Sequence, residues 1–175
     1  MEKQLKQTRY WIFFFMVVLF FSGLTAIPLE MELGFLTRCI PVHTPAGEWI
    51  DKVFLAIVDT NRQYPYLMYG YDWLAFAHFV LAILFYGPLK DPVKNKWVIE
   101  FGMIACVLIV PFAMIAGHYR GIPMGWRLID CAFGVIGLIP LSICLFKIKI
   151  LEKYNRVEVY EPAASENWLA IATKK

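Results

Sequence analysis

The sequence predicts an all-α integral membrane protein, a four-transmembrane-helix bundle with an outer amphipathic helix in its first loop. Of its 175 residues, 59% are hydrophobic and only 18% are charged, whereas ordinary soluble domains have about 25% charged residues. The hydrophobic residues also gather into four long segments, each close to the length of about 20 residues that crosses a hydrocarbon core. Both observations indicate a chain folded in a membrane.

The predicted spans cover residues 10–27, 68–86, 97–116 and 128–146. Aromatic residues such as Tyr10, Trp73 and Trp126 stand near their ends, where membrane–water interfaces favour them. The first span has a basic start, like a signal peptide, but its apolar run is too long and it has a poor cleavage site, so we expect it to be retained. Residues 1–156 then form the membrane domain, and residues 157–175 a cytoplasmic tail that is loose or docks on a partner.

Orientation follows from the basic residues near the span ends. If the N-terminus is cytoplasmic, the inner side holds ten of them and the outer side holds five. The inner residues are Lys3, Lys6, Arg9, Lys90, Lys94, Lys96, Lys147, Lys149, Lys153 and Arg156, and the outer ones are Arg38, Lys52, Arg62, Arg120 and Arg127. The positive-inside rule therefore places both termini in the cytoplasm of a plasma membrane, or bacterial inner membrane.

The first outer loop, residues 29–67, is too long for a simple connector. Thr44 followed by Pro45 is typical of a helix start. Apolar residues then recur at helical spacing from Trp49 to Ile57, with charged residues on the other side. This pattern predicts an amphipathic helix that packs on the protein, rests on lipid or caps the mouth of the bundle.

The candidate site is the hairpin GHYRGIPMGWRLID, residues 117–130, between the third and fourth spans. Ionisable groups at such a depth are costly unless they are paired or functional. With Asp72 of the second span they form a predicted polar mouth on the outer side, made of Asp72, His118, Arg120, Arg127 and Asp130, and the predicted ligand-binding residues are these five and His78. The alternative is structural: Arg127 and Asp130 neutralise each other, and Arg120 is a solvated loop charge.

Helix phase predicts which faces point inward. Glu100 and His118 lie five turns apart on one face of the third span, which we expect to point into the bundle. On the fourth span, Asp130 begins a stripe with Gly134, Gly137, Leu141 and Cys144, so Asp130 is expected to face a neighbouring helix. His78 lies near the bilayer centre, where a histidine more often hydrogen-bonds a neighbouring helix than carries a ligand or proton.

The sequence gives little support for a cofactor or a metal. His78, His118 and His43 are expected at different levels, which disfavours a bis-histidine haem, and the outer histidines and acids lack a diagnostic metal-ligand spacing. The chain has four scattered cysteines and no CxxC, unlike four-span thiol oxidoreductases of the vitamin K epoxide reductase kind. A bridge between Cys39 and Cys131 is less favoured than free thiols. We therefore expect no cofactor.

Size, four spans and cytoplasmic termini make the chain similar in layout to small sterol-binding and sterol-isomerase membrane proteins of the EXPERA type. The resemblance implies that such a bundle can hold a lipid-like molecule, and no site residue is carried over from it. Two functions stay open. One is a non-enzymatic accessory subunit or small-ligand and lipid-binding protein, with a membrane-protein partner or a second copy and no nucleic acid. The alternative is a membrane-embedded enzyme or proton-handling component that uses His78 with Asp130 or Glu100.

Overall fold

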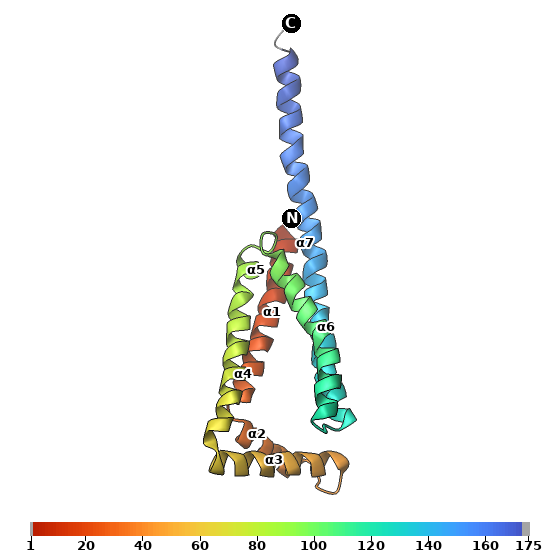
Figure 1. Cartoon of the computed structure of the whole chain (residues 1–175). Helices are drawn as coiled ribbons and strands as arrows, with labels where there is room; N and C mark the ends of the chain where they lie inside the picture. The colour runs from red at the N-terminus through yellow and green to blue at the C-terminus, as the bar shows by residue number, and fades with distance from the viewer. Residues whose placement is uncertain (1, 173–175) are drawn as a thin grey trace. The chain divides into compact units, whose positions relative to one another are not determined.

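Helices form all of the regular secondary structure in residues 2–172, the part of the chain described by the computed structural model (Figure 1). Side chains are described for residues 2–154. The helices are α1 (Glu2–Ala26), α2 (Leu29–Cys39), α3 (Pro45–Gln63), α4 (Pro65–Leu84), α5 (Tyr86–Lys90), α6 (Lys96–Tyr119) and α7 (Met124–Ala172). The prediction of an all-α chain is confirmed over these residues.

Among the residues that the structure describes, four helical segments are long and apolar enough to cross a membrane, as the sequence predicts. They are Glu2–Ala26, Pro65–Lys90, Lys96–Tyr119 and Met124–Tyr154. Each contains one predicted span, except that the first predicted span ends at residue 27, one position after α1. These four helical segments fit membrane spans and indicate a membrane protein.

The last helix is much longer than its predicted span. α7 contains 49 residues, which corresponds to about 74 Å at 1.5 Å per residue. A hydrocarbon core is only about 30 Å thick. More than half of α7 must therefore lie outside that core.

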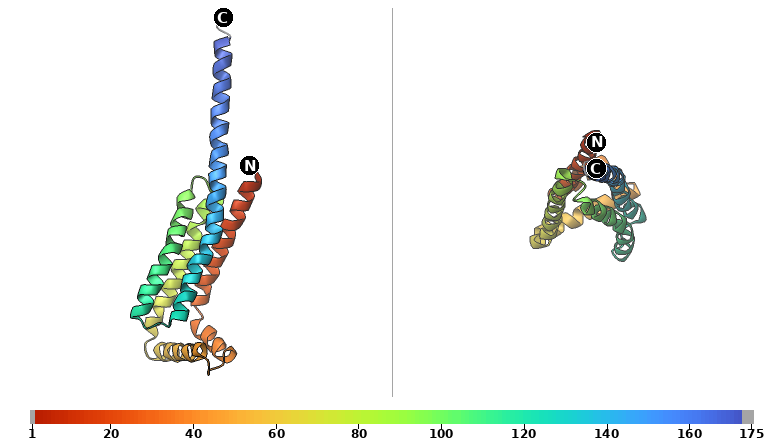
Figure 2. Two further views of the ribbon diagram at one scale, coloured as in Figure 1. Left: turned by 90° about the vertical axis from the view of Figure 1, so that its right-hand side faces the viewer. Right: turned by 90° about the horizontal axis from the view of Figure 1, so that it is seen from above.

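The residues form two compact units, Met1–Phe15 with Leu84–Lys175 and Met16–Ile83. In the first unit, α6 and α7 run side by side (Figure 2). Gly134 and Gly137 of α7 permit this close approach, because a Cβ at Gly134 would clash with the Cys106 carbonyl oxygen of α6. A Cβ at Gly137 would lie 2.9 Å from the Cys106 Sγ. The small-residue stripe thus serves a contact within the chain.

The core of the first unit continues from this contact towards the start of α1. Phe85 is 2% exposed, and its ring lies 4.8 Å from the ring of Phe15, centroid to centroid. Gly102 leaves room for this ring, since an added Cβ would be 2.8 Å from the Phe85 Cζ. Leu141 and Cys144 are fully buried in the same region. Close packing of large rings over glycines joins α1, α5, α6 and α7 here.

The second unit contains the predicted amphipathic helix of the first loop, which is confirmed as α3. The Thr44 hydroxyl oxygen accepts a hydrogen bond from the Gly47 amide at 3.1 Å, and Pro45 is the first residue of the helix. Ile50, on the predicted apolar side, is 3% exposed. Capping and amphipathic spacing therefore located this helix correctly.

The sequence did not predict α2, which packs against α3 in the second unit. Phe54 of α3 lies against Gly34 of α2, and the Asn61 amide nitrogen donates to the Glu30 carboxylate at 2.8 Å. The residue before α2 is Pro28, which supplies no side-chain cap. Without a capping side chain, the start of α2 carries none of the signals that located α3.

Candidate functional site

The hairpin between α6 and α7 is closed by Arg127. Its Nε donates a hydrogen bond to the Ile122 carbonyl oxygen at 2.7 Å. Its aliphatic stem packs on Gly117, where an added Cβ would lie 2.8 Å from the Arg127 Cγ. Arg127 is half-buried. This side chain therefore holds the turn on the first residues of α7, through packing as well as through charge.

The turn itself is a Schellman motif at the end of α6. The Gly121 amide donates to the His118 carbonyl oxygen at 3.2 Å, and the Ile122 amide donates to the Gly117 carbonyl oxygen at 2.9 Å. Gly121 has a φ of +66°, the left-handed conformation that this motif needs and that glycine adopts without strain. The hairpin is thus a defined structure, fixed at Gly121 and at Arg127.

Three predicted site residues are exposed on this hairpin, and we call them the hairpin surface: His118, Arg120 and Asp130. His118 lies in the last turn of α6, Arg120 follows that helix, and Asp130 lies in the second turn of α7. The ion pairs described for residues 2–154 do not join Asp130 to Arg127. The ion pair that the structural alternative expects between Arg127 and Asp130 is therefore not among them, whereas Arg120 is exposed, as that alternative expects.

Asp130 does not face α6, contrary to the expected helix phase. The α7 face that meets α6 begins at Arg127, followed by Cys131, whose Sγ lies 3.9 Å from the Val110 carbonyl oxygen, and by Gly134. Asp130 is exposed. The contact of Arg127 with Gly117 sets this rotation of α7, and the buried part of the stripe therefore starts at Gly134.

The expected inward face of α6 is likewise wrong for its contact with α7. Glu100 and His118 are both exposed, and Val107 between them is 55% exposed. The buried face lies on the opposite side of the helix and includes Gly102, Cys106, Ala113 and Gly117. Small side chains let the helices approach closely, and that packing decides the rotation of α6. Glu100 instead lies near Lys96, at 3.9 Å.

The other two predicted site residues belong to α4, in the second unit. Asp72 is exposed, in the second turn of the helix. The His78 Nδ1 lies 2.8 Å from the Leu74 carbonyl oxygen. Since a carbonyl only accepts, Nδ1 is the hydrogen-bond donor in this contact, and Nε2 takes no part in it. The hydrogen bond expected between His78 and another helix is replaced by this bond within α4.

His78 also forms part of a helix contact within the second unit. A Cβ added at Gly23 of α1 would lie 2.8 Å from the His78 Cβ and 2.9 Å from the Ala75 carbonyl oxygen. Ala75 is 1% exposed. The packing of α1 on α4 therefore depends on the absence of a side chain at Gly23, with the base of His78 as one of the surfaces in contact.

A polar cluster at the N-terminal end of α1 was missed by the sequence analysis. Lys147 of α7 donates to the Gln7 Oε1 at 2.6 Å and to the Gln4 Oε1 at 3.1 Å. Lys96 of α6 donates to the Glu152 carboxylate of α7 at 3.2 Å. The signal available was the spacing of Gln4 and Gln7, one turn apart ahead of an apolar run.

The Arg9 guanidinium adds a further link to this region, since its Nη2 donates to the Lys90 carbonyl oxygen at 2.9 Å. Together these bonds connect α1 with α7, α6 with α7, and α1 with the residues before α6. Among the side chains described in residues 2–154, most of the hydrogen bonds between different helices of the first unit therefore lie at this end, away from the hairpin surface.

Cysteines and potential metal ligands complete the site inventory. All four cysteines are free thiols, and Cys106 and Cys144 are buried. Among residues 2–154 no group of three or more histidine, cysteine, aspartate or glutamate side chains is placed to hold a metal ion. The chemistry offered by the hairpin surface is thus that of one imidazole, one guanidinium and one carboxylate, all open to a binding partner.

Comparison of the chain with protein-family models, curated proteins and solved structures gives no match.

Proposed function

We propose that this protein is a non-enzymatic accessory subunit of a membrane assembly, and that its hairpin surface binds a membrane-protein partner. In this proposal the four spans form one bundle in the plasma membrane, or bacterial inner membrane, with both termini in the cytoplasm and the hairpin outside. The observation that carries it is that one charged side chain of the hairpin has a structural role while the other charged and ionisable side chains are exposed. Arg127 is engaged in holding the turn, while His118, Arg120 and Asp130 remain exposed.

Exposure of these side chains favours binding over catalysis. Catalytic acids and bases usually lie in clefts where burial and neighbouring charges shift their pKa values. Charged groups on an exposed rim act mainly through complementarity with a partner, which gives specificity and speeds association. A hairpin fixed by the Gly121 turn and by Arg127 presents its charges in one arrangement, and this lowers the entropy lost on binding.

Asp72 is assigned to the same outer mouth in this proposal. It lies in the second turn of α4, just after the outer loop. Asp130 likewise lies in the second turn of α7. If the spans form one bundle, Asp72 and Asp130 therefore lie at a similar depth relative to the bilayer. The mouth then carries two carboxylates beside Arg120 and His118. A small lipid-like ligand held at this mouth is the other form of the same binding proposal.

The alternative proposal is a proton-handling component or enzyme that uses His78 with Asp130 or Glu100. The observation that favours it is the hydrogen bond from Nδ1 to the Leu74 carbonyl, which leaves Nε2 available for proton transfer. The contact of Gly23 with the base of His78 gives the residue a packing role as well. Replacement His78→Gln separates the packing role from the proton-handling role, since glutamine keeps much of the side-chain volume and has no ionisable ring.

Site-specific photo-crosslinking in the native membrane tests the accessory role. A photoreactive phenylalanine analogue replaces Tyr119, which is 84% exposed beside His118 and Arg120. The control position is Phe112, two turns earlier on α6 and 73% exposed. We expect one discrete protein adduct from position 119, lost when Arg120→Ala and Asp130→Asn are combined with the probe, and no such adduct from position 112.

Adducts at both positions, or an adduct at 119 that survives the double substitution, would contradict a specific hairpin partner. An adduct of twice the chain mass identifies the partner as a second copy. Loss of a proton-handling activity in His78→Gln, with the adduct from position 119 unchanged, would favour the proton-handling alternative instead.

A further inference from the structure

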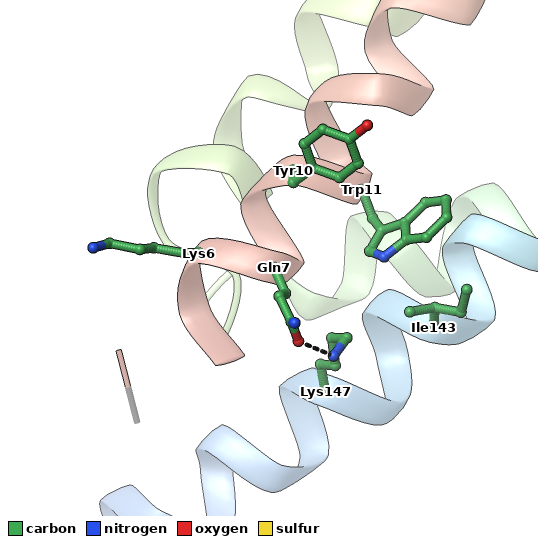
Figure 3. A pocket seen from close by; sticks show the side chains of 6 residues that line it. All are labelled: Lys6, Gln7, Tyr10, Trp11, Ile143 and Lys147. Atoms are coloured by element: carbon green, nitrogen blue, oxygen red, sulfur yellow. Dashed lines mark hydrogen bonds between the residues drawn. The ribbon is translucent and has the colours of Figure 1, made fainter. Parts of the chain in front are cut away.

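A groove with a volume of about 550 Å³ lies between the start of α1 and α7 in the first unit. It is lined by Lys6, Gln7, Tyr10, Trp11, Ile143 and Lys147 (Figure 3). Two of these residues are basic, two are interfacial aromatics, one is an amide, and one is aliphatic. The lining contains no acidic residue, so its electrostatic character is that of an anion site.

Lys147 is the cation that the surrounding residues hold in place. Its ammonium group donates to the Gln7 Oε1 at 2.6 Å and to the Gln4 Oε1 at 3.1 Å. A lysine ammonium has three donors, so one donor is left for a ligand. Because the Gln7 oxygen accepts from Lys147, the Gln7 amide nitrogen supplies two further donors. Donors of this kind suit a phosphate oxygen.

Lys6 stands at the rim of the groove. In Figure 3 its side chain extends away from Lys147. The Lys6 Nζ forms an ion pair with the Glu2 carboxylate at 2.7 Å. Both members of that pair are largely exposed, at 75% and 80%, so the pair is weak in water. Lys6 is therefore able to turn towards an anion in the groove without a large loss of stability.

The aromatic residues set the depth of the groove relative to a bilayer. Tyr10 and Trp11 mark the start of the apolar part of α1, where interfacial aromatic side chains lie at the headgroup level. Gln7 and Lys147 lie beyond them, away from the apolar part. The Trp11 ring also meets Phe14 edge-to-face at 6.0 Å between centroids, and Phe14 is 45% exposed. The groove therefore has a polar end, at Gln7 and Lys147, next to an apolar wall at Trp11, which contacts Phe14.

We propose that this groove binds the headgroup of an anionic phospholipid, with the phosphate on Lys147 and Gln7 and an acyl chain along Trp11, Phe14 and Ile143. The order of the lining residues matches the order of chemistry in a lipid, from charged phosphate through the interface to hydrocarbon. A soluble anion would use only the polar end. The site is separate from the hairpin surface, and it stands whether or not the hairpin has a partner.

Native mass spectrometry of the full-length, delipidated protein tests this inference. The protein is titrated with phosphatidylglycerol and with phosphatidylcholine of the same acyl chains. We expect tighter binding of phosphatidylglycerol to the wild type, and a loss of about fivefold in Lys147→Met, the contribution of one lysine at a membrane surface. The matched control is Lys149→Met, because Lys149 is exposed on the same helix and does not line the groove.

A second variant covers the possibility that Lys147→Met weakens the fold. Gln7→Leu roughly keeps the side-chain volume and changes an exposed position. It removes the two N–H donors of the Gln7 amide and the oxygen that accepts the hydrogen bond from Lys147. Its preference for phosphatidylglycerol should fall in the same direction, with melting close to that of the wild type. Equal losses in Lys147→Met and Lys149→Met, or no loss in Gln7→Leu, would overturn the site. So would complete displacement of the lipid by millimolar inorganic phosphate, which would show a simple anion site.

Discussion

Gly134 of α7 lies directly against the backbone carbonyl of Cys106 in α6, in a space that no side chain larger than hydrogen can share. Gly137, one turn later, meets the Cys106 Sγ, and Cys106 is 7% exposed. Helices in a membrane associate mainly through van der Waals packing, because lipid tails solvate apolar side chains as well as a neighbouring helix does. This contact is therefore a main stabilising feature of the first unit.

The first prediction concerns this contact. Gly134→Ala should reduce the free energy of unfolding by about 1–3 kcal/mol, because the new methyl meets backbone that cannot move aside as a flexible side chain can. Gly125→Ala on the same helix is the control, since nothing lies within 4 Å of its added Cβ. Thermal unfolding of the two variants in one detergent measures the difference. Equal stability would show that α6 and α7 do not approach this closely.

How far the sequence predicts this fold depends on the range of the interactions involved. Hydropathy locates the spans, because each span is a local run of apolar residues. The cap at Thr44 locates α3 in the same way. The contact between α6 and α7 does not use the faces that carry Glu100 and Asp130, because small residues far away in the chain decide which faces of these two helices meet.

The candidate site shows the same limit. The turn is visible in the sequence as Gly121 followed by Pro123, but the role of Arg127 is not, since it depends on how α7 returns beside Gly117. Lys147 and Gln7 are 140 positions apart, and only the tertiary fold brings them together. Charge counting treats Lys147 as one more basic residue, and the spacing of Gln4 and Gln7 gives no indication that Lys147 is their partner.

The second prediction concerns the turn of the hairpin. Gly121→Ala should lower the stability by about 1–2 kcal/mol, because its φ of +66° brings a Cβ too close to the backbone. The space around Gly121 is open, so the loss comes from backbone strain alone. Gly121→Asn should lose less, since asparagine tolerates this conformation better. A variant with alanine that melts like the wild type would contradict the turn described here.

The third prediction separates the two arginines of the hairpin. Arg127→Ala removes the hydrogen bond to the Ile122 carbonyl and the cover over Gly117. We expect hydrogen exchange of the amides of residues 117–127 to speed up about fivefold to tenfold, which corresponds to the loss of one hydrogen bond of about 1–1.5 kcal/mol. Arg120→Ala should leave exchange in α7 unchanged, because Arg120 is exposed. Similar profiles for both variants would assign Arg127 no structural role.

The fourth prediction compares the two carboxylates near Lys96. The Glu152 carboxylate lies 3.2 Å from Nζ, with both side chains 27% exposed, whereas Glu100 lies at 3.9 Å and is 48% exposed. A double-mutant cycle with Lys96→Met should give a coupling energy of up to about 1 kcal/mol for Glu152→Gln. The same cycle with Glu100→Gln should give clearly less. The coupling to Glu152 should also weaken at high salt, and a larger coupling to Glu100 would reverse the assignment.

The fifth prediction tests the proposed orientation through the exposed thiol of Cys39 in α2. With cytoplasmic termini, Cys39 lies outside, so a membrane-impermeant maleimide should label the wild type in intact cells. Cys39→Ser should lose most of this label, because Cys106 and Cys144 are buried and Cys131 is half-buried. As an inner control, Lys94→Cys in the Cys39→Ser background replaces a side chain that is 84% exposed, and it should react only after the cells are opened. Labelling of position 94 in intact cells, with Cys39 protected until lysis, would reverse the topology and move the hairpin surface to the cytoplasm.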